Sequence, residues 1–140
     1  MIKVAMIGFG GIARAHLSGY QLLEKEGKAK VIAAMDIRPE AFTEEIDINI
    51  GADESGKLGF NTYTDLDEML AKESPDMIDI CLPTYLHAET AIAMMKRGFP
   101  VMVEKPMART YEQCKEMLAV AEETGKPLMV GQVLHFFAEY

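Results

Sequence analysis

The residues best suited to chemistry lie near the start of the chain, where Gly8, Gly10 and Ala13 follow an apolar run. Their Gly-x-Gly-x-x-Ala spacing is a form of the dinucleotide-binding fingerprint. Gly8 permits a tight turn, Gly10 lets the backbone approach a pyrophosphate, and Ala13 keeps the following helix close to a sheet. The unpaired N–H groups at the start of that helix, aided by its dipole, would then face the phosphates.

An acidic residue stands where the same fingerprint requires one. Asp36 ends an apolar run and lies 23 residues beyond Ala13, near the expected spacing of about 20. A carboxylate there accepts hydrogen bonds from the ribose of NAD and repels the 2′-phosphate of NADP, although Arg38 would weaken this discrimination. The alternative is a glycine turn in an unrelated α/β protein. We expect NAD in preference to NADP, contacted by Gly8, Phe9, Gly10, Gly11, Ile12, Ala13, Asp36, Ile37 and Arg38.

Two further polar segments follow predicted strands, where a doubly wound fold binds its ligand. Pro83, Thr84 and His87 come after the predicted strand 76–82. Glu104-Lys105-Pro106 comes after the predicted strand 100–103. A carboxylate and an ammonium side by side at a strand end are not needed for folding, but a solvated turn would explain them equally well. We therefore treat both segments as candidate ligand contacts.

The elements that must position these residues alternate along the chain. Continuous apolar runs predict strands, and apolar residues at helical spacing lie between them. This alternation predicts an α/β fold, a doubly wound Rossmann sheet of parallel strands with helices on both faces. The predicted strands are 2–7, 30–36, 60–62, 76–82, 100–103 and 127–131.

Helix signals are clear in three places. The predicted apolar faces are Ala13, Leu17 and Tyr20; Ala88, Ala91, Ile92 and Met95; and Cys114, Met117, Leu118 and Ala121. Thr110 with Gln113 predicts a capping box that begins the last helix, which Gly125 ends. Residues 47–57, rich in glycine and acids, are expected to form a solvent-exposed connection.

Composition excludes several functional classes. The net charge of −8 and the absence of a basic stripe argue against nucleic-acid binding. No apolar run approaches the ~20 residues of a membrane span, and no cleavage site of a signal peptide follows the first strand. We expect a cytoplasmic protein of one domain in which Cys81 and Cys114 are reduced, buried thiols.

Several other residues that could do chemistry are given ordinary roles. No set of His, Asp or Glu has metal-ligand spacing, so no metal site is predicted. His16 is interpreted as a packing or surface residue. Asp76 and Asp79 lie within a predicted strand and away from its carboxyl end, so neither is interpreted as catalytic.

Together these motifs resemble the Gfo/Idh/MocA family, the group that includes glucose–fructose oxidoreductase and inositol dehydrogenase. The resemblance covers the whole chain, and Glu104-Lys105-Pro106 is its most specific part. The C-terminal tail differs from what looks like the family pattern Arg-Phe-x-Pro-x-Tyr, with His135 for the arginine and Ala138 for the proline. This difference argues against a substrate role for the tail but leaves the predicted fold unchanged.

The resemblance also implies a domain organisation. Family members have an N-terminal Rossmann domain and then a larger α/β domain that binds substrate and supplies an acid/base histidine. Residues 1–131 would be the dinucleotide-binding domain, and residues 132–140 would begin the connection to a substrate domain that this chain lacks. The apolar tail should make the chain associate with itself, as a homo-oligomer, or pack on a neighbour.

The same resemblance implies roles for the second group of residues. Lys105 would be catalytic, orienting or polarising a substrate hydroxyl, and Glu104 would position the nicotinamide. Pro106 would hold the turn, for which a cis peptide bond is an option. The nicotinamide end would be lined by Leu82, Pro83, Thr84, His87 and Gln132. Hydride would pass between NAD and a CH–OH carbon of a sugar, cyclitol or related polyol; the alternative is a non-catalytic NAD-binding module or cofactor-sensing regulator, which has no need of Lys105.

Overall fold

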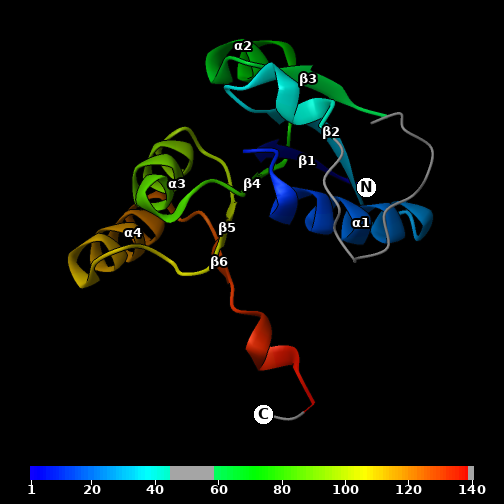
Figure 1. Ribbon diagram of the computed structural model, residues 1–140. Helices are drawn as coiled ribbons and strands as arrows, with labels where there is room; N and C mark the ends of the chain where they lie inside the picture. Colours follow the sequence, from blue (N-terminus) through cyan, green and yellow to red (C-terminus); the bar gives the residue numbers. More distant parts are fainter. Residues whose placement is uncertain (45–58, 139–140) are drawn as a thin grey trace. The chain divides into compact units, whose positions relative to one another are not determined.

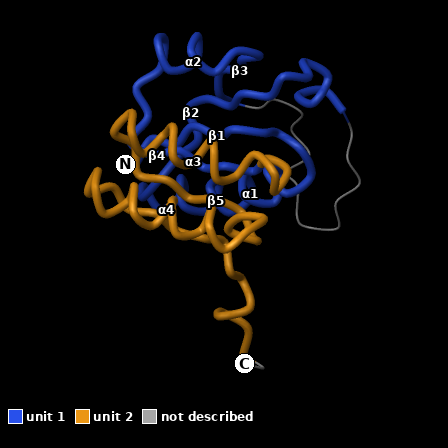
Figure 2. The backbone as a smooth tube through the Cα atoms, turned by 90° about the vertical axis from the view of Figure 1, so that its left-hand side faces the viewer, with its two compact units in different colours: residues 1–81 blue, residues 82–140 orange. Residues whose placement is uncertain are grey.

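The structure, a computed structural model, describes residues 1–44 and 59–138 of the chain. These residues fall into two units, residues 1–81 and residues 82–140 (Figure 2). Each unit carries part of the residues that the sequence analysis selected.

Unit 1 contains four parallel strands in the order β3-β2-β1-β4 (Figure 1). The strands are β1 (Ile2–Ile7), β2 (Ala29–Met35), β3 (Asn61–Tyr63) and β4 (Met77–Ile80). Helix α1 (Gly11–Lys25) connects β1 to β2, the short helix η1 (Pro39–Phe42) follows β2, and α2 (Leu66–Lys72) connects β3 to β4.

The core of unit 1 lies between α1 and the strands. Val4, Ala5, Met6 and Ile7 are all buried, as expected of a parallel strand covered on both faces. The ring of Phe9 packs 5.2 Å from that of Phe42 and 5.7 Å from that of Phe60, measured between ring centroids. The buried members of this cluster are Met6, Phe9, Ala13, Val31, Ala34 and Cys81, with Leu17 and Tyr20 packed against them. This packing fixes the loop between β1 and α1.

Unit 2 contains the parallel pair β5 (Val101–Glu104) and β6 (Leu128–Gly131). Helices α3 (His87–Lys96) and α4 (Tyr111–Thr124) pack against each other (Figure 1). Two short helices, η2 (Thr84–Leu86) and η3 (Val133–Phe136), lie before α3 and after β6. The strand orders within the two units are those of a Rossmann fold, whose full order is 3-2-1-4-5-6.

The predicted α/β doubly wound fold class is therefore confirmed. All six predicted strands exist, and β1 has its predicted bounds. The capping box of Thr110 and Gln113 is present, and Gly125 ends α4 with a φ of 64°. Local signals of this kind are reliable because a cap or a left-handed residue depends on neighbours in the chain.

Two predictions about burial are wrong. Leu118 is exposed, because the buried stripe of α4 runs through Met117 and Val120 rather than toward position 118. Cys114 is only half-buried, although Cys81 is buried as expected, and neither cysteine forms a disulfide.

The predicted connection over residues 47–57 lies outside the described residues. Within the parts of the chain that the structure describes, no helix is long and apolar enough to cross a membrane.

Candidate functional site

The glycine loop leaves space at the position where the fingerprint expects phosphate. Gly8 has a φ of 87°, a left-handed conformation that favours glycine, and its N–H donates to Met35 O at 2.8 Å. Gly10 has ordinary backbone angles, with φ −88° and ψ −164°. Apart from its neighbours in the chain, no heavy atom of the described residues lies within 4 Å of a Cβ built on Gly10. The protein itself does not require glycine at position 10.

Helix α1 begins at this open space. No described side chain caps its N-terminus, and no acidic residue lies in its first turn. The backbone hydrogen bonding of the helix starts with Arg14 N–H, which donates to Gly10 O at 3.3 Å, so the earlier N–H groups have no partner within the helix. An open cradle at an uncapped helix N-terminus fits the pyrophosphate of a dinucleotide.

Asp36 follows β2 and is linked to the glycine loop. Its Oδ2 accepts a hydrogen bond from Phe9 N–H at 2.8 Å, and its Oδ1 accepts one from Arg38 N–H at 2.9 Å. The carboxylate is thereby held at one orientation with lone pairs left on both oxygens. Arg38 Nε lies 3.5 Å from Asp36 Oδ1, so the guanidinium is close to the carboxylate that it was expected to modulate.

The remaining predicted contacts in unit 1 differ in exposure. The side chain of Phe9 is fully buried, so only its backbone faces the loop. Ile12, in the first turn of α1, and Ile37, next to Asp36, are 43% and 79% exposed. Both are therefore apolar side chains available to a ligand at the carboxyl end of β1 and β2.

In unit 2, His87 joins two loops that carry predicted site residues. Its Nε2 lies 2.7 Å from Leu82 O, and its Nδ1 lies 2.9 Å from Pro106 O. The ring is 1% exposed. His87 therefore fixes the loop that bears Pro83 and Thr84 relative to the loop that bears Lys105.

The last residue of β5, Glu104, and the residue after it, Lys105, form a charged pair with unequal exposure. Glu104 is buried, and its Oε2 accepts a hydrogen bond from Lys105 N–H at 3.0 Å. Lys105 is exposed, and its peptide bond to Pro106 is cis. Gly131 lies opposite Glu104 in β6, and a Cβ there would lie 3.0 Å from Glu104 Oε1. Gln132, directly after β6, is exposed.

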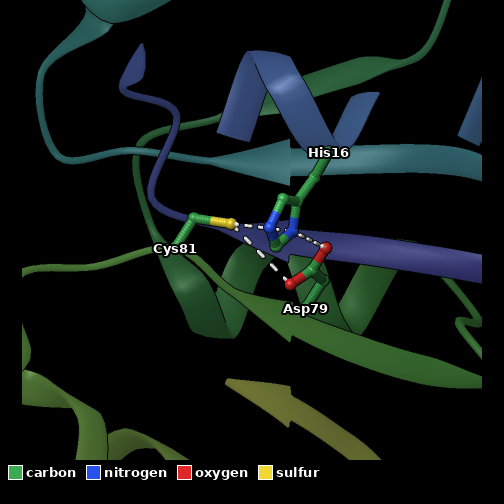
Figure 3. Close-up of side chains that lie close together, drawn as sticks. All are labelled: His16, Asp79 and Cys81. Carbon is green, nitrogen blue, oxygen red and sulfur yellow. Dashed lines mark hydrogen bonds and ion pairs between the residues drawn. The ribbon is translucent and has the colours of Figure 1, made fainter. Parts of the chain in front are cut away.

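Unit 1 also contains a cluster that sequence reasoning missed. His16 of α1, Asp79 of β4 and Cys81, just after β4, bring one nitrogen, one carboxylate and one sulfur within 4.8 Å of one another (Figure 3). His16 lies 63 residues from Asp79 and 65 from Cys81 in the chain, so no spacing rule connects them. The predicted position of Asp79, away from the carboxyl end of its strand, is wrong because β4 is shorter than predicted and ends at Ile80.

The hydroxyl of Tyr20 belongs to the same cluster. Burial, the negative charge of Asp79 and a hydrogen bond to that carboxylate raise the pKa of Tyr20 well above its ordinary value. Tyr20 is therefore a permanent hydrogen-bond donor to Asp79.

Comparison with known proteins gives relatives over nearly the whole chain. It is 32% identical to 4-carboxy-2-hydroxymuconate-6-semialdehyde dehydrogenase of Sphingobium sp. over 96% of this chain and 39% of that protein. It is 33% identical to 2,7-anhydro-N-acetylneuraminate hydratase of Mediterraneibacter gnavus over 85% of this chain and 29% of that protein. The chain thus spans well under half the length of these curated relatives.

A solved structure agrees with these relatives. The WlbA dehydrogenase from Bordetella pertussis, solved in complex with NADH and UDP-GlcNAcA, is 29% identical and superimposes with a TM-score of 0.76 over 92% of this chain and 35% of that one. Residues 2–132 match the family GFO_IDH_MocA, described as "Oxidoreductase family, NAD-binding Rossmann fold". This match agrees with the glycine loop, the buried Asp36 and the strand order described above. The chain therefore belongs to the Gfo/Idh/MocA oxidoreductase family and corresponds to the NAD-binding Rossmann domain of its members.

Proposed function

We propose that this domain belongs to an enzyme that transfers hydride between NAD and a carbon bearing a hydroxyl group in a sugar, cyclitol or related polyol. The main support for NAD as the cofactor is the open space over Gly10 at the uncapped start of α1, beside the fixed carboxylate of Asp36. When bound, the nicotinamide ring would supply the hydride acceptor or donor.

Residues of unit 1 would hold the adenosine and the phosphates. The N–H groups at the start of α1 would donate to the pyrophosphate, and Asp36 would accept hydrogen bonds from ribose hydroxyls. Gly8, Phe9 and Gly11 would contribute backbone, while Ile12 and Ile37 would contribute exposed apolar surface.

Residues of unit 2 would serve the reacting end. Lys105 Nζ would donate a hydrogen bond to the substrate hydroxyl and stabilise negative charge as its proton leaves. The buried carboxylate of Glu104 fixes the Lys105 backbone through the N–H···O bond, and His87 ties the neighbouring loop to Pro106. Pro83, Thr84 and Gln132 would complete the wall of the site.

The proposal includes an organisation of the whole protein. Residues 1–131 form the dinucleotide-binding domain, and residues 132–140 lead into a substrate domain that supplies the acid/base group. The full protein would act in the cytoplasm on a small-molecule substrate and would form a homo-oligomer. The exposed apolar residues Leu134, Phe136 and Phe137 favour a covering partner for this tail.

The test of the hydride step replaces Lys105 in the full-length protein. Lys105→Met should lower kcat for oxidation of the polyol by about 100-fold or more, because removing one hydrogen-bond donor from a developing oxyanion lowers kcat by about this factor. The affinity for NAD should change little. Lys96→Met removes an exposed lysine at the end of α3 and serves as the matched control. Equal kcat values in Lys105→Met and wild type would refute the role of Lys105.

A second reaction class follows from the relative named as a hydratase. Net addition of water to a sugar leaves no reduced cofactor at the end, whereas net oxidation accumulates NADH. Substrate consumption measured by NMR, in parallel with NADH absorbance, separates the two. A cofactor-sensing regulator would give neither signal with any sugar and would keep full NAD affinity in Lys105→Met.

A further inference from the structure

The cluster of His16, Asp79 and Cys81 lies entirely within unit 1 and combines three different ligand types (Figure 3). His16 Nδ1 lies 2.9 Å from Asp79 Oδ2 and 3.5 Å from Cys81 Sγ, and Cys81 Sγ lies 3.7 Å from Asp79 Oδ1. The three side chains therefore turn their ligand atoms toward one point. Helix α1 contributes the imidazole, and the end of β4 contributes the other two groups.

The distances between the three groups are close to those between ligands of a tetrahedral metal site. Zinc bonds of about 2.05 Å to nitrogen, 2.1 Å to oxygen and 2.3 Å to sulfur place tetrahedral ligands about 3.4 Å (N to O), 3.6 Å (N to S) and 3.6 Å (S to O) apart. The N···S and S···O distances of 3.5 and 3.7 Å already agree with these values. The N···O distance of 2.9 Å involves Oδ2 whereas the S···O distance involves Oδ1, so a rotation of the carboxylate must bring one oxygen to about 3.4–3.6 Å from both other ligand atoms.

In the structure the three groups form hydrogen bonds with one another, and both His16 Nδ1 and Cys81 Sγ contact the Asp79 carboxylate. The Nδ1 atom of His16 faces both the carboxylate and the sulfur. A cation placed between the three groups would be coordinated by all of them in place of these hydrogen bonds. The charges also balance, because a carboxylate and a thiolate neutralise a divalent cation next to a neutral imidazole.

The surroundings support the same interpretation. Asp79 is completely buried, and Tyr20 donates a hydrogen bond to it, which orients the carboxylate as the partners of metal ligands commonly do. Cys81 is 7% exposed, whereas the side chain of His16 is 14% exposed and gives the cluster an edge that solvent reaches. A cation would enter past the imidazole.

We propose that His16 Nδ1, an Asp79 oxygen and Cys81 Sγ form a binding site for a thiophilic divalent cation of the Zn²⁺ class. On binding, the Cys81 thiol releases its proton to solvent and a metal–sulfur bond forms. The imidazole coordinates through Nδ1 and carries its proton on Nε2. The mixed nitrogen, oxygen and sulfur set favours Zn²⁺ or Co²⁺ over Mg²⁺ or Ca²⁺, which prefer oxygen ligands.

Cobalt titration of the reduced 140-residue chain tests this site directly. Co²⁺ should produce a thiolate-to-metal charge-transfer band and the visible bands of tetrahedral cobalt, and Zn²⁺ should displace both. Zn²⁺ should also raise the thermal unfolding midpoint, and calorimetry in two buffers should show at least one proton released per cation. Absence of the thiolate band in the folded chain would overturn the proposal.

Variants locate the site. Cys81→Ser should abolish the charge-transfer band, while Cys114→Ser, the matched control in unit 2, should keep it. His16→Gln should weaken Co²⁺ affinity by more than about 100-fold, and Tyr20→Phe by about 10- to 100-fold, the usual effect of losing a hydrogen-bond partner of a ligand. Far-ultraviolet circular dichroism checks each fold; if Cys81→Ser does not fold, the more exposed His16→Gln carries the test. Unchanged affinity in a folded His16→Gln or Cys81→Ser chain, or loss of the band in Cys114→Ser, would refute the assignment.

Discussion

Gly10 is the residue at which the difference between folding and binding is sharpest. Its backbone angles are open to any residue, and the described protein atoms leave room for a side chain. A fold requirement therefore does not explain glycine there, whereas the close approach of a pyrophosphate that we propose would.

Replacing Gly10 by valine should abolish NAD binding and leave the fold intact, because the new side chain would occupy the phosphate space. Calorimetric titration with NADH measures binding, and thermal unfolding measures the fold. Gly19→Val places the same side chain on an exposed position of α1, also with no described atom within 4 Å, and should bind normally. Normal NADH binding by Gly10→Val would mean that the phosphates lie elsewhere.

Asp36 should make the domain prefer NAD to NADP. Its carboxylate would repel the 2′-phosphate, although the Arg38 guanidinium 3.5 Å away reduces that repulsion. Titration with both cofactors should give tighter binding of NAD(H), and Arg38→Gln should widen the difference. Tighter NADP(H) binding by the wild-type chain would contradict this assignment.

At the scale of elements, single side chains hold separate segments of each unit together. His87 joins the Leu82 and Pro106 carbonyls, and Glu73, which ends α2, joins Asn61 and Tyr63 of β3 at 2.7 and 2.6 Å. Such contacts matter because the loops that follow the strands of a parallel sheet lie outside the sheet's own hydrogen bonds and need other contacts to position them.

Removing the His87 ring should destabilise the domain substantially. His87→Ala removes a buried ring together with its hydrogen bonding to two part-buried carbonyls, so we expect a loss of about 2–4 kcal/mol. Urea unfolding measures the change. Leu118→Ala, on the exposed side of α4, should change stability by no more than about 0.5 kcal/mol. If the two variants lost similar free energies of unfolding, His87 would not join the two loops as we infer.

Tyr63 should lose its phenolic proton at a higher pH than an ordinary tyrosine. The hydrogen bond to Glu73 raises the pKa of Tyr63 to about 12, and the same bond lowers that of Glu73. Because the folded-state pKa is raised, the bond stabilises the fold fully below pH 10 and is lost as the pH rises from 10 to about 12. The difference in tyrosinate absorbance between wild type and Tyr63→Phe isolates this titration, with circular dichroism confirming that the fold persists.

Glu73→Gln provides the comparison for that titration. An uncharged partner should bring the Tyr63 midpoint down toward 10. An unchanged midpoint would show that Glu73 does not set it.

At the scale of the whole molecule, the chain spans 39% of one curated relative and 29% of the other, and the proposed reaction requires a substrate domain beyond these residues. The 140-residue chain should bind NADH but turn over no sugar or inositol. A base and a second wall that excludes water are both needed for near-attack geometry, which contributes many orders of magnitude to rate. A panel of polyols, followed by NADH absorbance, measures this. Clear turnover by the purified chain would place the whole active site within these residues.

Local signals in the sequence determined most of the fold. Several features depend only on residues close together in the chain, so the sequence predicts them directly: the apolar strands, the glycine turn, the capping box at Thr110 and the end of α4 at Gly125. The same reasoning selected Asp36 and Glu104-Lys105-Pro106 as site residues, because strand ends in a parallel sheet are where ligands bind.

Contacts between distant residues were decided only by the tertiary structure. No spacing indicated that Asp36 accepts the Phe9 N–H, that His87 bridges Leu82 and Pro106, or that Leu118 lies outside the buried stripe of α4. The cluster of His16, Asp79 and Cys81 is the clearest case, since residues more than 60 positions apart in the chain must be brought together by packing before the three ligand atoms meet. Packing of this kind depends on the shapes of both elements, and a linear pattern in either one does not contain it.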